Sequence, residues 1–181
     1  MKNKLLTLAA MTVLAGVTAV SLPASAQTTA PANGTEEAMK LDKNSFASAV
    51  ASSNQLEIVT SQMALKRASS SEVKSFAQQM IDDHTKAGEE FAAAVKQEGL
   101  SAPEALMPKH QSMVQELEGA SDADFDSAYI ALQTAAHTEA VSIFRAYSDQ
   151  PDSEALGAFA KKTLPTLEKH LEHVKTLKPQ Q

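Results

Sequence analysis

Four stretches of the chain, each about 25 residues long, repeat apolar side chains at steps of three or four. This spacing places the apolar side chains along one face of an α-helix, which has about 3.6 residues per turn. The pattern predicts helices over residues 44–68, 71–97, 122–148 and 151–177. Helices of this length, about 37 Å each, bury their apolar faces by packing against one another.

The connections between these stretches predict how the helices are joined. Only a few residues separate the first stretch from the second and the third from the fourth, so each pair forms a tight hairpin. Residues 98–121 are longer, are interrupted by prolines and glycines, and predict one short helix. Two hairpins joined by a long crossover make an all-α, ferritin-like four-helix bundle. An all-α solenoid pair is the alternative, and the presence of only two units weighs against it.

The first 26 residues have the features of a signal peptide. Lys2 and Lys4 precede an apolar segment at 5–22, and Ala24-x-Ala26 supplies a cleavage site. We therefore expect a periplasmic or secreted protein, with an uncleaved membrane anchor as the alternative. Small and polar residues then predict a disordered leader at 27–43, followed by the folded domain at 44–178.

Composition limits the partners of the chain. The net charge is −6, and removing residues 1–26 leaves 14 Lys and Arg against 22 Asp and Glu, a formal charge of −8. An acidic surface disfavours nucleic acid and anionic lipid, so we expect no nucleic-acid partner and no stable membrane insertion after signal cleavage. The composition is compatible with a homo-oligomer or with a protein partner in the envelope. Because the chain has no cysteine, neither a disulfide nor a lipoprotein anchor is available.

Each predicted long helix carries one ionisable residue on or beside its apolar stripe. These residues are Glu57, His84, His137 and His170. Buried ionisable groups need partners or a metal, and the inward positions of a helical bundle are where metal sites are built. The four residues are therefore candidate ligands of one divalent transition-metal ion. The alternative is that the histidines are core polar groups with ordinary hydrogen-bond partners.

Counting along the helices predicts which candidates meet. Glu57, His84 and His137 lie at similar distances from the hairpin turns of their helices. The count for His170 places it about 10 Å further from its turn than the other three residues. The prediction is a compact site of the first three, which His170 joins only if Pro165 kinks or shifts the last helix. Three other residues, Asp82, Asp83 and His110, are expected to face solvent.

Three segments resemble the domain of unknown function 4142 family, small exported bacterial proteins with a ferritin-like fold. The segments are "EVKSFAQQMIDDH" (72–84), "FDSAYIALQTAAH" (125–137) and "FAKKTLPTLEKHL" (159–171). The resemblance covers about residues 44–177 and implies the fold and an exported location, but no activity and no catalytic residue. The family's recurring histidines would match His84, His137 and His170.

The chain departs from the Glu-x-x-His pattern of di-iron bundles. Ile81, Thr134 and Leu167 stand three residues before the inward histidines, and Glu57 is the one inward acid. Two iron cations need more carboxylates than this, so the sequence favours a mononuclear site for zinc, copper, nickel or iron(II).

Three functions follow as hypotheses. The leading one is a non-enzymatic exported bundle that binds one metal ion or small ligand in its core, with a stress or envelope role. The second is a structural or protein-interaction module, in which the inward histidines fix the helix register. The third is a metal-dependent enzyme, which the missing Glu-x-x-His pairs disfavour.

Overall fold

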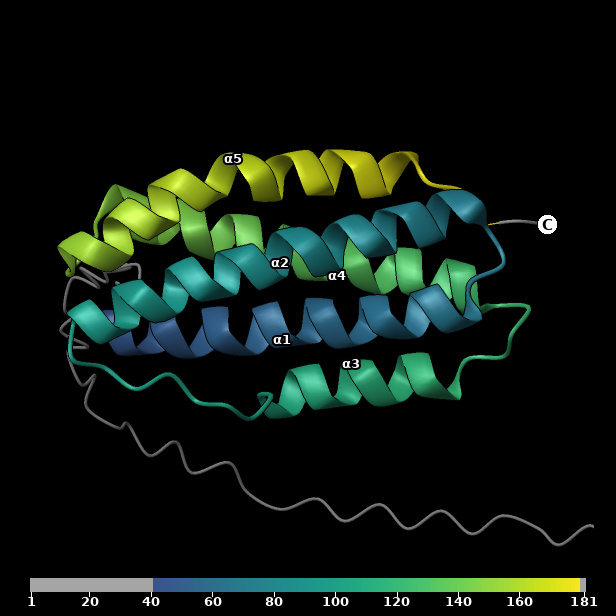
Figure 1. The fold of residues 1–181 in the computed structure, drawn as a ribbon, viewed down its shortest axis with the longest axis horizontal. Coiled ribbons are helices and arrows are strands. Elements are labelled where there is room, and N and C mark those ends of the chain that lie inside the picture. The colour runs from purple at the N-terminus through teal and green to yellow at the C-terminus, as the bar shows by residue number, and fades with distance from the viewer. Residues whose placement is uncertain (1–40, 180–181) are drawn as a thin grey trace, which may run out of the picture. The chain divides into compact units, whose positions relative to one another are not determined.

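The computed structural model describes residues 41–179, which form five helices and no strand (Figure 1). The helices are α1 (Lys43–Arg67), α2 (Ser71–Gln97), α3 (Pro108–Gly119), α4 (Phe125–Asp149) and α5 (Glu154–Thr176). The all-α class and the short helix in the long connection are confirmed. In this part of the chain, no helix is long and apolar enough to cross a membrane. The predicted signal peptide and the leader up to residue 40 lie outside the described residues.

The four long helices pack side by side as a helical bundle. α1 packs against α2 and α4, and α5 packs against α4 and α2, so each long helix has two long neighbours. The shorter α3 lies along the outside of the bundle, against α1 and α4 (Figure 1). This arrangement points one face of each of the four long helices into a shared interior.

Side-chain caps fix where α2 and α5 begin. Ser70 Oγ accepts a hydrogen bond from the Val73 N–H at the start of α2. Ser153 Oγ accepts one from the Leu156 N–H, so α5 begins at Glu154 rather than at the predicted Pro151. This later start changes the level at which the residues of α5 meet the other helices.

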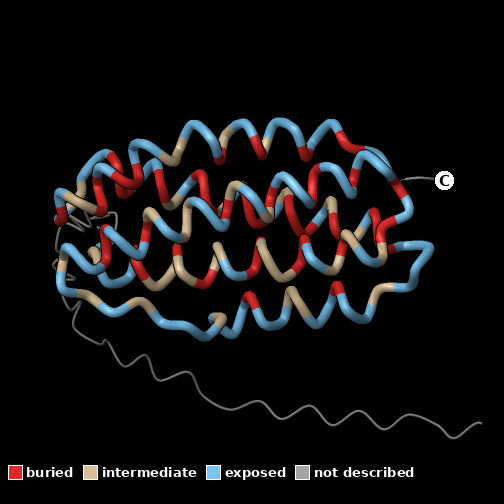
Figure 2. Tube along the Cα trace, viewed as in Figure 1, coloured by how far each residue is buried: buried red, intermediate tan, exposed pale blue. Residues whose placement is uncertain are grey.

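A polar layer divides the buried interior into two apolar clusters. One cluster includes Phe46, Phe91 and Phe144, and the other includes Phe76 and Tyr129. On each long helix, one candidate residue lies between the stretches that supply the two clusters. The buried residues lie along the inner faces of the helices (Figure 2). The four candidates therefore share the middle of the bundle.

His110 is buried, and the prediction that it faces solvent was wrong. Its Nδ1 lies 2.6 Å from Ser52 Oγ, and the same oxygen accepts a hydrogen bond from the Met107 N–H at 2.7 Å. The Ser52 hydroxyl is therefore hydrogen-bonded to both His110 and the Met107 N–H, and it fastens α3 to α1. The periodicity of the long helices carries no information about this contact, because it depends on where the crossover lies.

Candidate metal centre

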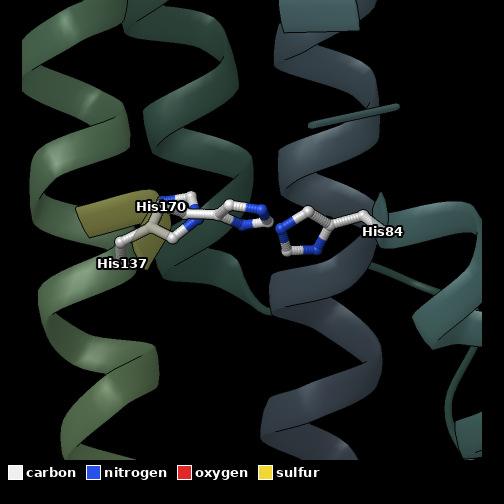
Figure 3. A group of neighbouring side chains, drawn as sticks. All are labelled: His84, His137 and His170. Atoms are coloured by element: carbon white, nitrogen blue, oxygen red, sulfur yellow. The ribbon is translucent and has the colours of Figure 1, made fainter. Parts of the chain in front are cut away.

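Three histidine side chains meet in the core of the bundle. His84 of α2, His137 of α4 and His170 of α5 point toward one another (Figure 3). Their ring centroids are 5.4 to 5.7 Å apart. One ring nitrogen from each lies within 4.8 Å of the other two, and all three residues are buried. We call these three residues the histidine group.

Each ring of the group uses its other nitrogen in a hydrogen bond to an oxygen outside the group. The pairs are His84 Nδ1 with Asn54 Oδ1 at 3.2 Å, His137 Nδ1 with the Gln133 backbone oxygen at 3.0 Å, and His170 Nε2 with Asp83 Oδ2 at 2.9 Å. Such outer partners orient histidines that bind metals and fix which nitrogen carries the proton.

These partners determine which nitrogens are free to bind. A backbone carbonyl and a carboxylate accept hydrogen bonds, so His137 Nδ1 and His170 Nε2 must be the protonated nitrogens. The Asn54 side-chain oxygen is also an acceptor, so His84 Nδ1 is the protonated nitrogen of its ring. The lone pairs then lie on Nε2 of His84, Nε2 of His137 and Nδ1 of His170. All three atoms are buried without a hydrogen-bond partner.

Burial favours the neutral, metal-binding form of the His84 and His170 rings. Burial lowers the pKa of His84 well below its ordinary value, and the neighbouring His137 and His170 lower it further. Burial also lowers the pKa of His170, although its hydrogen bond to Asp83 opposes that effect. A neutral imidazole is the metal ligand, so metal binding does not first require a proton to leave either of these rings.

Three neutral imidazoles around one point are a recognised donor set for a transition metal. Zinc accepts three histidines in a tetrahedral site and keeps the fourth position for water or substrate. Tetrahedral Zn–N bonds of about 2.0 Å would place the nitrogens about 3.3 Å apart, which is closer than the 4.8 Å limit within which they lie here. A small inward movement of the rings would complete the geometry.

Glu57 lies beside the histidine group rather than inside it. Its Oε1 is 3.5 Å from His137 Nδ1, the nitrogen that faces away from the free lone pairs. Both of its carboxyl oxygens are fully buried without a hydrogen-bond partner. Burial raises its pKa, and the nearby His137 and Gln133 oppose the rise. The carboxyl group therefore lies next to His137 without a hydrogen bond to it.

His170 belongs to the group, and the level counted for it from the sequence was wrong. It lies 16 residues after the start of α5, and His137 lies 12 residues before the end of α4. This difference corresponds to about 6 Å of helix rise. Helical side chains lean toward the N-terminus of their own helix, and α4 and α5 are antiparallel, so the two rings lean toward each other.

Asp83 also differs from its prediction. It was expected on a solvated face, but its carboxylate joins the half-exposed edge of α2 to the buried His170. Asp82 stays exposed as predicted, where Gln78 donates a hydrogen bond to it. Periodicity separated these adjacent acids from the apolar stripe, but it could not tell which of them would face α5.

Asn54 was missed by the sequence reasoning, although one signal pointed to its surroundings. Gly88 lies inside α2, where glycine is unfavourable without a packing reason. A Cβ on Gly88 would be 3.0 Å from Asn54 Nδ2. The glycine therefore leaves room for the amide that holds His84.

Comparison with known proteins decides the family. The family model "Domain of unknown function (DUF4142)" matches residues 25–177. The chain belongs to the DUF4142 family. This confirms the resemblance seen in the sequence, and the match includes the whole histidine group. No curated protein matches the chain.

A solved structure shows a fold similar to that of this DUF4142 protein. It is YcfI from Rhodopseudomonas palustris, described as "a putative structural protein", with a TM-score of 0.62 and 13 % identity. The similarity covers 74 % of this chain and 90 % of YcfI. At this identity the comparison establishes the fold alone.

Proposed function

We propose that this DUF4142 protein is an exported helical bundle that binds one divalent transition-metal ion through His84, His137 and His170. The observation that carries the proposal is the convergence of three buried imidazole lone pairs, none of which has a hydrogen-bond donor. Leaving buried polar atoms unpaired costs free energy. A cation removes that cost at all three nitrogens at once.

The donor set favours a borderline metal ion. Imidazole nitrogens suit zinc, copper, nickel and iron(II), and the absence of thiolates disfavours a site built for the softest ions. The three ligands are neutral, so the ion would keep its double positive charge. Asp83, whose carboxylate contacts His170, supplies compensating negative charge beside that ring, and the carboxyl group of Glu57 lies beside His137.

The ferritin-like topology and the export of the protein are parts of this proposal. Support for the topology comes from two hairpins, α1–α2 and α4–α5, joined by a crossover that contains α3. Support for export comes from the signal-peptide features of residues 1–26. In the envelope, such a protein would serve a stress or metal-handling role.

Elemental analysis tests the proposal. The protein is exported with its own signal, purified without chelator and measured by mass spectrometry, together with His84→Ala, His137→Ala and the control His173→Ala. His173 is an exposed histidine of α5. We expect close to one metal ion per chain in the wild type and in the control, and loss of metal in the other two. A wild type that stays free of metal after incubation with zinc, copper, nickel and iron(II) would overturn the proposal.

A structural module is the second candidate, and a specific observation favours it. Two hydrogen bonds of the histidine group cross between helices, from His84 to α1 and from His170 to α2. Such bonds fix the register of packed helices without any ion. In that case His84→Ala would destabilise the protein equally with and without chelator, whereas a metal site predicts a larger loss when metal is present.

A further inference from the structure

A small cavity lies next to the histidine group. Its volume is about 30 Å³, and His84 is the member of the histidine group that lines it. Ala87, Ala140 and Leu167 also line it, and each lies three residues from the histidine of its own helix. Because α5 runs opposite to α2 and α4 (Figure 1), these three residues form the layer of the bundle directly beside the histidines.

The cavity exists because this layer contains small side chains. Ala87 and Ala140 stand where larger apolar residues would fill the interior, as Phe91 and Phe144 do one turn further on. A volume of 10–15 Å³ by this measure is enough for one water molecule, so about 30 Å³ accepts two or three heavy atoms.

The wall of the cavity is thin on the side between α2 and α5. A surface groove of about 140 Å³ runs there, lined by residues that include Asp83, Lys86 and Glu90. Ala87 and Thr163 line both the groove and the cavity. A small solute therefore needs only a local displacement of these two half-buried side chains to pass from the surface groove into the cavity beside His84.

We propose that the cavity holds a small exogenous ligand, a water molecule or an anion of two or three atoms, on the open coordination position of the bound metal. This inference rests on the metal site proposed above. Three histidines leave one position of a tetrahedral ion unfilled. Because the ligands are neutral, the ion attracts an anion, and the cavity limits its size.

Cobalt(II) with azide as the probe tests the inference. Cobalt(II) is added to the metal-free wild type, and its visible absorption is recorded as azide is titrated. We expect an azide-dependent change of the cobalt bands. Ala140→Val should bind cobalt(II) but require at least tenfold more azide, because its two added methyl groups occupy the cavity. Ala135→Val, at an exposed position of the same helix, should behave as the wild type.

The outcomes separate this inference from the proposed function. If the wild type binds no cobalt(II), the metal site itself is wrong. If cobalt(II) binds but azide leaves its spectrum unchanged, or if Ala140→Val responds to azide as the wild type does, the cavity is not the ligand site. Ala87→Val narrows the same cavity from α2 and should reproduce the effect of Ala140→Val.

Discussion

The carboxylate of Asp83, half-exposed on α2, lies 2.9 Å from the Nε2 of His170, which is buried on α5. This bond orients the ring so that its Nδ1 faces the other two histidines. A carboxylate in this position also raises the basicity of a metal-binding imidazole. The surface of the bundle is thereby connected to the proposed metal centre through one hydrogen bond.

Asp83→Asn should weaken metal binding without unfolding the bundle. The amide removes the negative charge beside His170, and loss of an outer partner of this kind typically costs about 10–100-fold in metal affinity. Competition with a coloured chelator measures the change. Asp82→Asn is the matched control because Asp82 stays exposed on the same helix. Equal affinities of the two variants would contradict the role given to Asp83.

Gly88→Ala should lower metal affinity several-fold. The added Cβ would stand 3.0 Å from Asn54 Nδ2, so the amide that holds His84 must shift. Helix propensity alone would make the same change stabilising by about 1 kcal/mol. We therefore expect weaker metal binding with no loss of stability in the metal-free protein, measured by chelator competition and urea unfolding. Gly119→Ala, which meets no neighbouring atom, should leave metal affinity unchanged.

Ser52→Ala should destabilise the protein by about 1–3 kcal/mol, because it removes the partner of the buried His110 ring and of the part-buried Met107 N–H. Urea unfolding gives the free energy. Ser75→Ala changes an exposed serine of α2 and should have a small effect. If the two variants are equally stable, the Ser52 hydrogen bonds between α3 and α1 contribute little to the free energy of unfolding.

The metal-free protein should lose stability as the pH falls below about 6.5, the ordinary pKa of histidine. The folded state holds His84 with a lowered pKa, so the unfolded chain binds more protons in this range, and stability falls with pH. Glu57, whose pKa is raised, acts in the opposite sense. The quantity to measure is therefore the difference in the free energy of unfolding between the wild type and His84→Gln, obtained from urea unfolding at pH 8, 7, 6 and 5. The wild type should lose more stability than the variant as the pH falls. A variant with the same pH dependence as the wild type would refute the prediction.

The sequence predicted the helices and the residues that enter their apolar stripes. Periodicity was sufficient for this, because a residue at a stripe position such as His84 or His137 faces the interior whichever helix lies opposite. The level of His170 was missed because the start of α5 depends on the Ser153 cap, and because side chains on antiparallel helices lean toward each other.

The outer partners of the histidine group could not be predicted from periodicity. Asp83 and Asn54 lie beside the stripes of their helices, where a side chain faces solvent or a neighbouring helix according to how the bundle is assembled. The same holds for His110, whose burial depends on the crossover lying against α1. Such contacts are set by tertiary packing rather than by local sequence.

The histidine group draws its members from three helices that are far apart along the chain. In a protein without cysteine, an ion bound there would be a cross-link between α2, α4 and α5. It would close two long loops of the chain, as a disulfide does, and would limit the conformations open to any partly unfolded state that retains the ion. Unlike a disulfide, this link would form and break with the concentration of the metal rather than with the redox conditions of the compartment.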